Sequence, residues 1–329
     1  MERDPRLTEG GTAVDGTDGR GGRAELLLPR EVPLGGPRAM LVNRTLPQRR
    51  RSLIGAWCFV DHYGPSEVAA QGGMRVPGHP HTGLQTVTWL FEGEVEHRDT
   101  TGAVITVKPG EVNLMTAGAG VAHSEYSTPA TTRVHGAQLW VALPDGARTG
   151  ERAFEHFVPD AVDVDGATVR VFLGEWLGRR AAPRTYTPIF GAEVLLPAGA
   201  VWRVPVDERM EVGVLVDRGT VSVEGVDAER SQLVALAPSR DAIELRVGGE
   251  DARVLVLGGE PFGAPVVMWW NFVGRDHDEV VAARADWQRQ VEQQRASGTA
   301  DGRFGPHPDA WQDVLPAPEL PTVRLKPRS

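Results

Sequence analysis

The chain has 329 residues, which is enough for two domains of ordinary size. With 41% hydrophobic and 24% charged residues it is typical of a water-soluble globular protein, and no run approaches the roughly 18 apolar residues that a membrane helix requires. The net charge of −9 argues against direct binding to nucleic acid. A single cysteine, Cys58, excludes an internal disulfide and leaves His, Asp and Glu as the candidate metal ligands.

The first segment, residues 1–25, mixes Gly, Asp, Arg and Thr and lacks the apolar region of a secretory signal. We therefore expect a disordered lead-in and a cytoplasmic protein. Beyond this segment, short runs such as 85–90 and 104–107 alternate with turns rich in Gly and Pro, the pattern of brief strands. Cys58 alternates with apolar neighbours and is expected to be buried on a strand. The pattern as a whole predicts an all-β barrel or sandwich.

Two stretches of the chain resemble each other weakly. The sequence Arg-Val-Pro at 75–77 recurs at 203–205, and each copy precedes a strand-like run and a turn glycine. Two related barrels explain this repeat better than one barrel does. The turn residues Leu-Pro-Asp-Gly at 143–146 indicate the principal break. We therefore predict an N-terminal domain at 26–145 and a C-terminal domain at 146–275.

The last segment, residues 276–329, contains the clearest helical pattern of the chain. Asp276 followed by Glu279 resembles a capping box. Apolar residues then recur at spacings of three and four, at Val280, Ala283, Trp287 and Val291. This pattern predicts an amphipathic helix that covers a barrel, followed beyond about Ser297 by an extended tail.

Two pairs of potential metal ligands have the same spacing. His79 and His81 are separated by one residue, and so are His123 and Glu125. In an extended strand, residues two apart point to the same face, so each pair can bind one ion. Two such pairs on separate strands could close a four-ligand site inside one barrel. The second copy of the repeat has no matching histidine pair, which assigns the site to the N-terminal domain.

Three neutral imidazoles and one carboxylate suit a transition-metal ion. Fe(II), Mn(II), Co(II), Ni(II), Cu(II) and Zn(II) all accept such ligands, whereas Ca(II) and Mg(II) prefer oxygen. Four protein ligands on an octahedral ion leave two positions open for a substrate or dioxygen. The alternative is that these histidines only satisfy hydrogen bonds in the core, which would explain one histidine alone better than two matched pairs.

Residues near the two pairs are interpreted as supporting residues. His97 is expected to be a hydrogen-bond donor behind the ligands or a surface group. Met115 is expected to pack beside the metal, because a thioether is a poor ligand for Fe(II). His62 is expected to be a turn residue that is hydrogen-bonded to backbone. No chemistry is assigned to the remaining histidines, which are His135, His156, His277 and His307.

Several motifs resemble those of the pirin family, a branch of the cupin superfamily with two barrels in one chain. They are Asp-His-Tyr-Gly-Pro at 61–65, His-Pro-His at 79–81, Glu-His-Arg-Asp at 96–99, Met-Thr-Ala-Gly at 115–118 and His-Ser-Glu at 123–125. The resemblance is strong over about residues 34–127 and looser in the second domain.

The resemblance implies a bicupin, in which two cupin-type β-barrels pack face to face and the second holds no metal. Together with the predicted C-terminal helix, this is the expected all-β fold. The resemblance also implies one metal ion, usually iron, bound at His79, His81, His123 and Glu125. Gln85 departs from the glutamate ligand of many cupins, and residues 268–273 replace a shorter aromatic-Gly-Pro-Phe pattern.

The resemblance leads to functions of different classes. The first is an iron-dependent dioxygenase that cleaves flavonol-like phenols, of the quercetin 2,3-dioxygenase type, with Glu125 as the catalytic residue that takes the hydroxyl proton of a small aromatic substrate. The alternative is a non-catalytic, redox-sensitive iron regulator that binds a protein partner, either a transcription factor or a metabolic enzyme. A third is a cupin that retains metal for stability alone. The native metal, the substrate and the oligomeric state stay open at this point.

Overall fold

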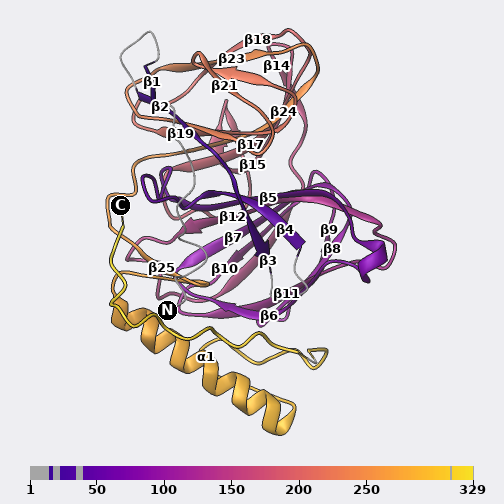
Figure 1. Cartoon of the computed structure of the whole chain (residues 1–329), viewed down its shortest axis with the longest axis vertical. Helices are drawn as coiled ribbons and strands as arrows, with labels where there is room; N and C mark the ends of the chain where they lie inside the picture. The colour runs from indigo at the N-terminus through magenta and orange to yellow at the C-terminus, as the bar shows by residue number, and fades with distance from the viewer. Residues whose placement is uncertain (1–14, 18–22, 35–39, 312, 329) are drawn as a thin grey trace.

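The computed structural model describes residues 15–17, 23–34, 40–311 and 313–328. Within these ranges the chain is built from β-strands and one α-helix, which runs beneath the N-terminal half (Figure 1). The prediction of an all-β protein in two halves with a C-terminal helix is confirmed.

The N-terminal half is a sandwich of two antiparallel sheets. In spatial order, its larger sheet contains β13 (Ala153–Phe157), β10 (Val112–Thr116), β7 (Leu84–Glu92), β12 (Arg133–Ala142), β5 (Trp57–Glu67), β4 (Met40–Leu46) and β3 (Arg30–Leu34). Its smaller sheet contains β6 (Arg75–His81), β11 (Val121–Ser127), β8 (Val95–Asp99) and β9 (Val104–Val107). A short 3-10 helix, η2 (Ala69–Gln71), precedes β6.

The C-terminal half repeats this arrangement. Its larger sheet contains β1 (Asp15–Thr17), β2 (Arg23–Leu27), β22 (Leu233–Leu236), β19 (Glu211–Arg218), β24 (Ala252–Gly259), β17 (Ile189–Leu196), β15 (Ala167–Trp176) and β14 (Val162–Val164), with β16 (Arg179–Arg180) paired to β15. Its smaller sheet contains β18 (Val201–Pro205), β23 (Ala242–Val247), β20 (Val221–Val223) and β21 (Val226–Ala228). As far as the structure describes the chain, each half is two separate sheets rather than one closed barrel.

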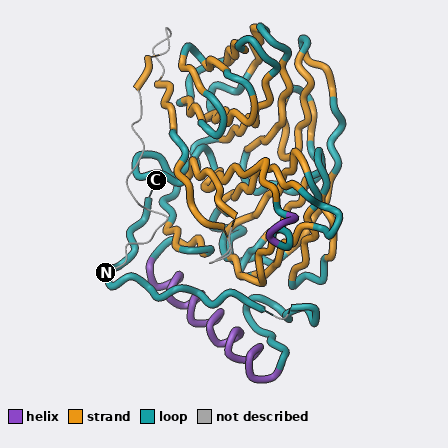
Figure 2. The backbone as a smooth tube through the Cα atoms, turned by 45° about the vertical axis from the view of Figure 1, so that its right-hand side comes forward, coloured by secondary structure: helices purple, strands orange, loops and turns teal. Residues whose placement is uncertain are grey.

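The two larger sheets face each other across a shared apolar core. The indole N–H of Trp57 lies within hydrogen-bonding distance of the carbonyl oxygens of Phe190 and Gly258, at 3.2 and 3.3 Å. Trp89 stacks on Phe172 with their ring centroids 4.7 Å apart. The two halves form one continuous stack of strands (Figure 2). A strand such as β7 is therefore covered on both faces, which explains why its first seven residues are all buried.

Strands near the predicted domain limits are exchanged between the halves. β2 pairs with β22 of the C-terminal half, and β13, which follows the predicted break, pairs with β10 of the N-terminal half. The limits 26–145 and 146–275 stay predictions. The segment 1–25, expected to be a disordered lead-in, forms strands β1 and β2 where it is described, and its other residues lie outside the described ranges.

The helix α1 (His277–Ser297) has the predicted cap and apolar stripe. The side chain of Asp276 accepts a hydrogen bond from the backbone N–H of Glu279 at 2.9 Å. The apolar stripe is buried against β25 (Val267–Trp269) and β26 (Phe272–Gly274). Beyond the helix the chain returns along β6, where the N–H of Leu315 donates to the carbonyl oxygen of Gly78 at 2.8 Å. No helix in the described part of the chain combines the length and apolarity needed to cross a membrane.

Candidate metal centre

Neighbouring strands of the smaller N-terminal sheet hold the predicted ligands. His79 and His81 lie on β6, and His123 and Glu125 lie on the adjacent strand β11. The antiparallel register places His79 directly opposite His123. Because residues two apart on a strand share a face, His79 and His81 can approach His123 together. All four side chains are buried.

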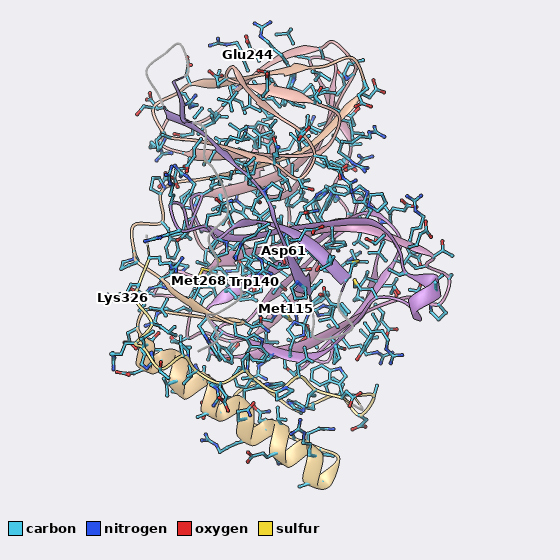
Figure 3. All side chains as sticks on the ribbon, viewed as in Figure 1. Asp61, Met115, Trp140, Glu244, Met268 and Lys326 are labelled. Atoms are coloured by element: carbon cyan, nitrogen blue, oxygen red, sulfur yellow. The ribbon has the colours of Figure 1, made fainter. Side chains whose placement is uncertain are left out.

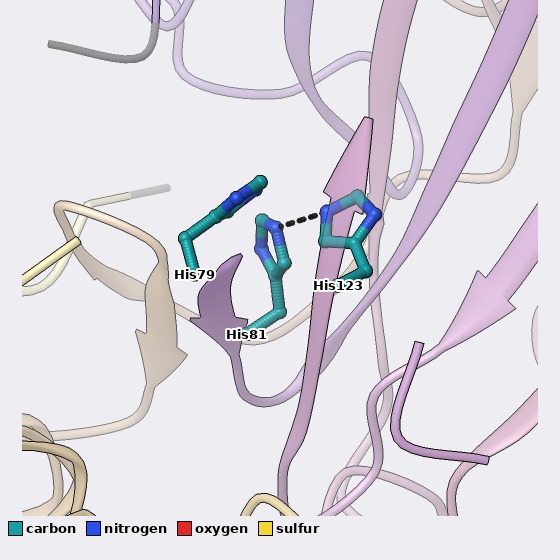
Figure 4. Close-up of side chains that lie close together, drawn as sticks. All are labelled: His79, His81 and His123. Atoms are coloured by element: carbon teal, nitrogen blue, oxygen red, sulfur yellow. Dashed lines mark hydrogen bonds between the residues drawn. The ribbon is translucent and has the colours of Figure 1, made fainter. Parts of the chain in front are cut away.

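The three histidines converge (Figure 4). Each offers a ring nitrogen, and these nitrogens lie within 4.8 Å of one another. Nε2 of His81 lies 3.0 Å from Nε2 of His123. The ring centroids of His79 and His123 are 4.4 Å apart. We refer to His79, His81 and His123 as the histidine cluster.

Glu125 lies beside this cluster rather than within it. A β-bulge after His123 shifts the register, so that Glu125 pairs with Val76 on one side and with His97 on the other. Its carboxylate accepts a hydrogen bond from the hydroxyl of Thr88 at 3.0 Å. Glu125, His97 and His123 form a second group whose potential ligand atoms lie within 4.8 Å. The structure thus brings three predicted ligands together and places the fourth in an adjoining group that shares His123.

The backbone determines which nitrogen of His79 faces the cluster. Nδ1 of His79 lies 2.9 Å from the carbonyl oxygen of Pro77. A carbonyl oxygen only accepts hydrogen bonds, so Nδ1 must carry the proton. Nε2 of His79 is therefore left with a free lone pair, in the arrangement that orients histidine ligands in metal sites.

Burial keeps the histidine cluster uncharged. It lowers the pKa of His79 to about 4. Burial and, to a smaller extent, the neighbouring histidines lower the pKa values of His81 and His123 well below the usual value. Burial also raises the pKa of Glu125, against the opposing effects of His97 and Thr88. At neutral pH the three imidazoles therefore present lone pairs, the form that binds a metal.

These donors fit a transition-metal ion. The Nε2 atoms of His81 and His123 are separated by 3.0 Å, so one ion with bonds of about 2.1 Å could reach both. Such a cation would engage both lone pairs at once. Imidazole nitrogen with one carboxylate oxygen is the ligand chemistry of Fe, Mn, Co, Ni, Cu and Zn.

Aromatic side chains line one side of the cluster. Trp140 meets the ring of His81 edge-on at 5.2 Å, and Phe59 stacks on Trp140 at 3.8 Å. Trp140 and Met115 both lie inside the N-terminal half (Figure 3). Met115 packs with apolar neighbours, and its expected place beside a metal stays a prediction. Cys58 is fully buried on β5, as expected. These apolar surfaces reduce the access of water to the cluster.

Gln85 stands where many cupins have a glutamate, and its side chain forms hydrogen bonds to residues outside the histidine cluster. Its side-chain amide lies within hydrogen-bonding distance of the hydroxyl of Thr116 and the carbonyl oxygen of Arg184, at 2.9 and 3.0 Å. In the described part of the chain, His156, His277 and His307 belong to none of the groups of His, Cys, Asp and Glu that could hold a metal.

A third group of potential ligands lies between the two halves, and the sequence analysis missed it. The expectation that His62 is a turn residue bonded to backbone is wrong, because its ring lies on β5 and contacts Ser231 Oγ at 2.7 Å and Asp217 Oδ1 at 2.8 Å. Nε2 of His135 lies 2.6 Å from the same carboxylate oxygen. We refer to His62, His135 and Asp217 as the interdomain cluster. These residues are far apart in the chain and share no local motif, so no sequence signal could have identified them.

Two double-sheet domains in tandem, with a histidine cluster in the first, define a bicupin of the cupin superfamily. Residues 39–141 match the model of the Pirin family, and residues 191–292 match that of the Pirin C-terminal cupin domain. The chain therefore belongs to the pirin family.

Relatives of known sequence or structure cover most of the chain. A Pseudomonas aeruginosa protein named "Putative quercetin 2,3-dioxygenase" is 41% identical, over 89% of this chain and 89% of that protein. A pirin-like protein from Caulobacter vibrioides is 36% identical, over 75% of this chain and 88% of that protein. The crystal structure of quercetin 2,3-dioxygenase from Acinetobacter baumannii has a TM-score of 0.83 and 37% identity, and covers 92% of this chain and 97% of that chain.

Proposed function

We propose that this protein is a metal-dependent dioxygenase that cleaves flavonol-like phenols, with Fe(II) as its metal. The observation that supports the proposal most directly is the cluster of three buried, uncharged imidazoles beside Glu125. The 37% identity to a solved quercetin 2,3-dioxygenase supports the substrate class. A small aromatic substrate also suits the aromatic wall formed by Trp140 and Phe59.

In this proposal the metal ligands are His79, His81, His123 and Glu125. When bound, iron would supply a Lewis acid and a redox-active centre at this position. The chain's own contribution is to present the imidazoles as neutral donors, because burial disfavours their protonation. The hydrogen bond from His79 to Pro77 holds one of these rings in its ligand orientation.

Glu125 is proposed as the group that takes the hydroxyl proton of the substrate. Burial raises the pKa of this carboxyl, which makes its ionised form a stronger base. Thr88 donates a hydrogen bond to one carboxylate oxygen at 3.0 Å and so restricts the orientation of the side chain. The enclosed position limits competition from bulk water.

The test combines metal analysis with oxygen uptake. Freshly purified protein is analysed for metals, loaded anaerobically with Fe(II), and mixed with a small panel of flavonols in an oxygen electrode. We expect oxygen uptake that matches the loss of flavonol, and none with a matched flavone that lacks the 3-hydroxyl group. Protein that holds iron but consumes no oxygen with any flavonol would exclude the dioxygenase and favour the redox-sensitive regulator.

A further inference from the structure

A chain of hydrogen bonds extends from the histidine cluster into strand β8. Nδ1 of His97 lies 3.3 Å from Nδ1 of His123, on the side of that ring remote from His81. Nε2 of His97 lies 3.0 Å from Oδ2 of Asp99. The register explains the alignment, because β8 pairs with β11 and places Asp99 directly opposite His123. His97, Asp99 and His123 are all buried.

Only one arrangement of protons satisfies this series of hydrogen bonds when Asp99 is ionised and both imidazoles are neutral. A carboxylate accepts hydrogen bonds only, so Nε2 of His97 carries the proton. Nδ1 of His97 is then an acceptor, and Nδ1 of His123 must donate to it. Nε2 of His123 is left with a free lone pair that faces His81 at 3.0 Å.

The carboxylate of Asp99, which begins this series of hydrogen bonds, is itself held in place. Its other oxygen, Oδ1, accepts hydrogen bonds from the backbone N–H and the hydroxyl of Thr101, at 2.7 and 2.6 Å, and from the N–H of Ala103 at 3.3 Å. Phe154 stacks on the ring of His97 with centroids 4.7 Å apart. One oxygen of Asp99 is therefore held by the donors of Thr101 and Ala103, and the other points at His97.

We propose that Asp99 and His97 are positioning residues of the metal centre, which hold His123 in the tautomer whose Nε2 binds the ion. The inference rests on the metal-binding part of the proposed function and does not depend on the substrate. Partners that orient a ligand histidine typically contribute about 10- to 100-fold in metal affinity. The carboxylate acts here through an intervening imidazole.

The geometry makes Asp99→Asn a specific test. The backbone donors at Thr101 and Ala103 require an acceptor, so the amide oxygen takes the place of Oδ1 and the NH₂ group points at His97. The amide then donates to Nε2 of His97 and moves the His97 proton to Nδ1. His123 must in turn accept at Nδ1 and carry its own proton on Nε2, where the metal should bind.

We expect Asp99→Asn to weaken the binding of Zn(II) or Co(II) by about 10- to 100-fold, measured by competition with a chelator. Nitrogen-detected NMR of the metal-free protein should show His123 protonated on Nδ1 in the wild type and on Nε2 in the variant. Asp163→Asn changes an exposed carboxylate on β14 and is the matched control, with unchanged metal affinity.

His97→Phe separates the proposed role from a merely structural one. Phenylalanine can still stack on Phe154, but it removes both links of the hydrogen-bond chain. Adding Asp99→Asn to His97→Phe should then cause no further loss of affinity. If Asp99→Asn lowers the metal affinity equally with and without His97→Phe, Asp99 acts through its hydrogen bonds to Thr101 and Ala103 rather than through His97. The proposal would then be wrong. The wild-type spectrum decides the matter even if Asp99→Asn does not fold, because His123 protonated on Nε2 would contradict the proposed chain.

The outcomes distinguish this inference from the proposed function. Failure of oxygen uptake with flavonols would remove the dioxygenase and leave the tautomer and affinity results intact. Conversely, unchanged tautomers and affinity in Asp99→Asn would remove the positioning role and leave the activity assay unaffected.

Discussion

Within the histidine cluster, the ring of His81 is enclosed by other ligand candidates and an aromatic ring. It is 1% exposed, its Nε2 lies 3.0 Å from His123, and Trp140 meets its ring edge-on. Glu125 differs, because the bulge in β11 turns its carboxylate toward Thr88 and His97. Substitutions at His81 and Glu125 should therefore have different consequences for metal binding and for turnover.

We expect His81→Ala to weaken metal binding by at least about 100-fold, because a ligand contributes more than the partners that orient it. The fold should persist, since the main apolar cores lie elsewhere. Metal content after dialysis and a thermal unfolding curve measure the two effects. His156→Ala, outside all the potential ligand groups in the described residues, is the control. Full iron occupancy in His81→Ala would exclude His81 as a ligand.

Glu125→Gln keeps the size of the side chain and one oxygen but removes the charge and the candidate base. We expect turnover per bound iron to fall by about 10²- to 10⁴-fold, the usual contribution of a general base. Part of the metal should remain, because the histidine cluster is unchanged. Oxygen uptake normalised to measured iron tests this expectation, and unchanged turnover per iron would remove Glu125 from the catalytic role.

At the scale of elements, the C-terminal tail packs on the outer face of the two ligand strands. The indole N–H of Trp311 donates to the hydroxyl of Ser124, which lies between His123 and Glu125, at 2.8 Å. A Cβ added to Gly78 would lie 2.7 Å from the Trp311 ring, so only glycine allows this close approach. Val314 forms a bridge to Gly78 beside it. The tail therefore holds β6 and β11 together from outside.

Trp311→Phe should lower the free energy of unfolding by about 1 kcal/mol, because it removes this buried hydrogen bond and retains an aromatic ring. Ser124→Ala removes the other partner of the same bond. Urea unfolding of both variants and of the double variant measures the coupling between them. We expect the double variant to lose less than the sum of the single losses, and strict additivity would show that the bond contributes nothing.

At the scale of the whole molecule, the interdomain cluster joins the two halves through polar groups. Oδ1 of Asp217 lies 2.8 Å from His62 and 2.6 Å from His135, and Arg253 binds Oδ2 at 2.5 Å. Burial raises the pKa of Asp217, but hydrogen bonds from His135 and His62 outweigh it and hold the pKa well below the usual value. Burial is also the main cause that lowers the pKa of His62, although Asp217 opposes it.

These shifts predict how stability depends on pH. Below the ordinary histidine pKa of 6.5, the unfolded chain takes up protons that His62 and His307 bind less readily in the folded protein, because burial lowers the pKa of both side chains. The free energy of unfolding should therefore fall as pH decreases from about 7 to 5, by up to about 1.4 kcal/mol per pH unit for each such proton. The contribution of Asp217 should persist through this range, because its lowered pKa keeps it ionised.

Urea unfolding of chelator-treated protein at several pH values measures this slope. His307→Gln should reduce it, since burial lowers the pKa of His307 to about 4. A free energy of unfolding that stays constant down to pH 5 would contradict the expected neutral state of these histidines.

Local patterns in the sequence were enough to predict several features. The capping residues and apolar stripe predicted α1, because helix periodicity depends only on neighbours three and four apart. The spacing of His79 and His81 predicted a shared face, because strand alternation is also local. The burial of Cys58 followed from the same rule.

Other features depended on which strands pair. His97 gained a partner in His123 only because β8 lies beside β11, and the bulge that displaces Glu125 belongs to the pairing of two strands rather than to either one. The exchange of β2 and β13 between the halves is likewise a property of the sheets.

The sequence by itself determined the strand-rich class, the C-terminal helix and the two pairs of potential ligands, because each follows from spacings of two to four residues. The tertiary structure alone decided that Asp99 and His97 extend the histidine cluster, and that His62 and His135 meet Asp217. The physical reason is that such contacts join residues from separate strands or separate halves. Their geometry depends on register and packing between elements, which no local pattern specifies.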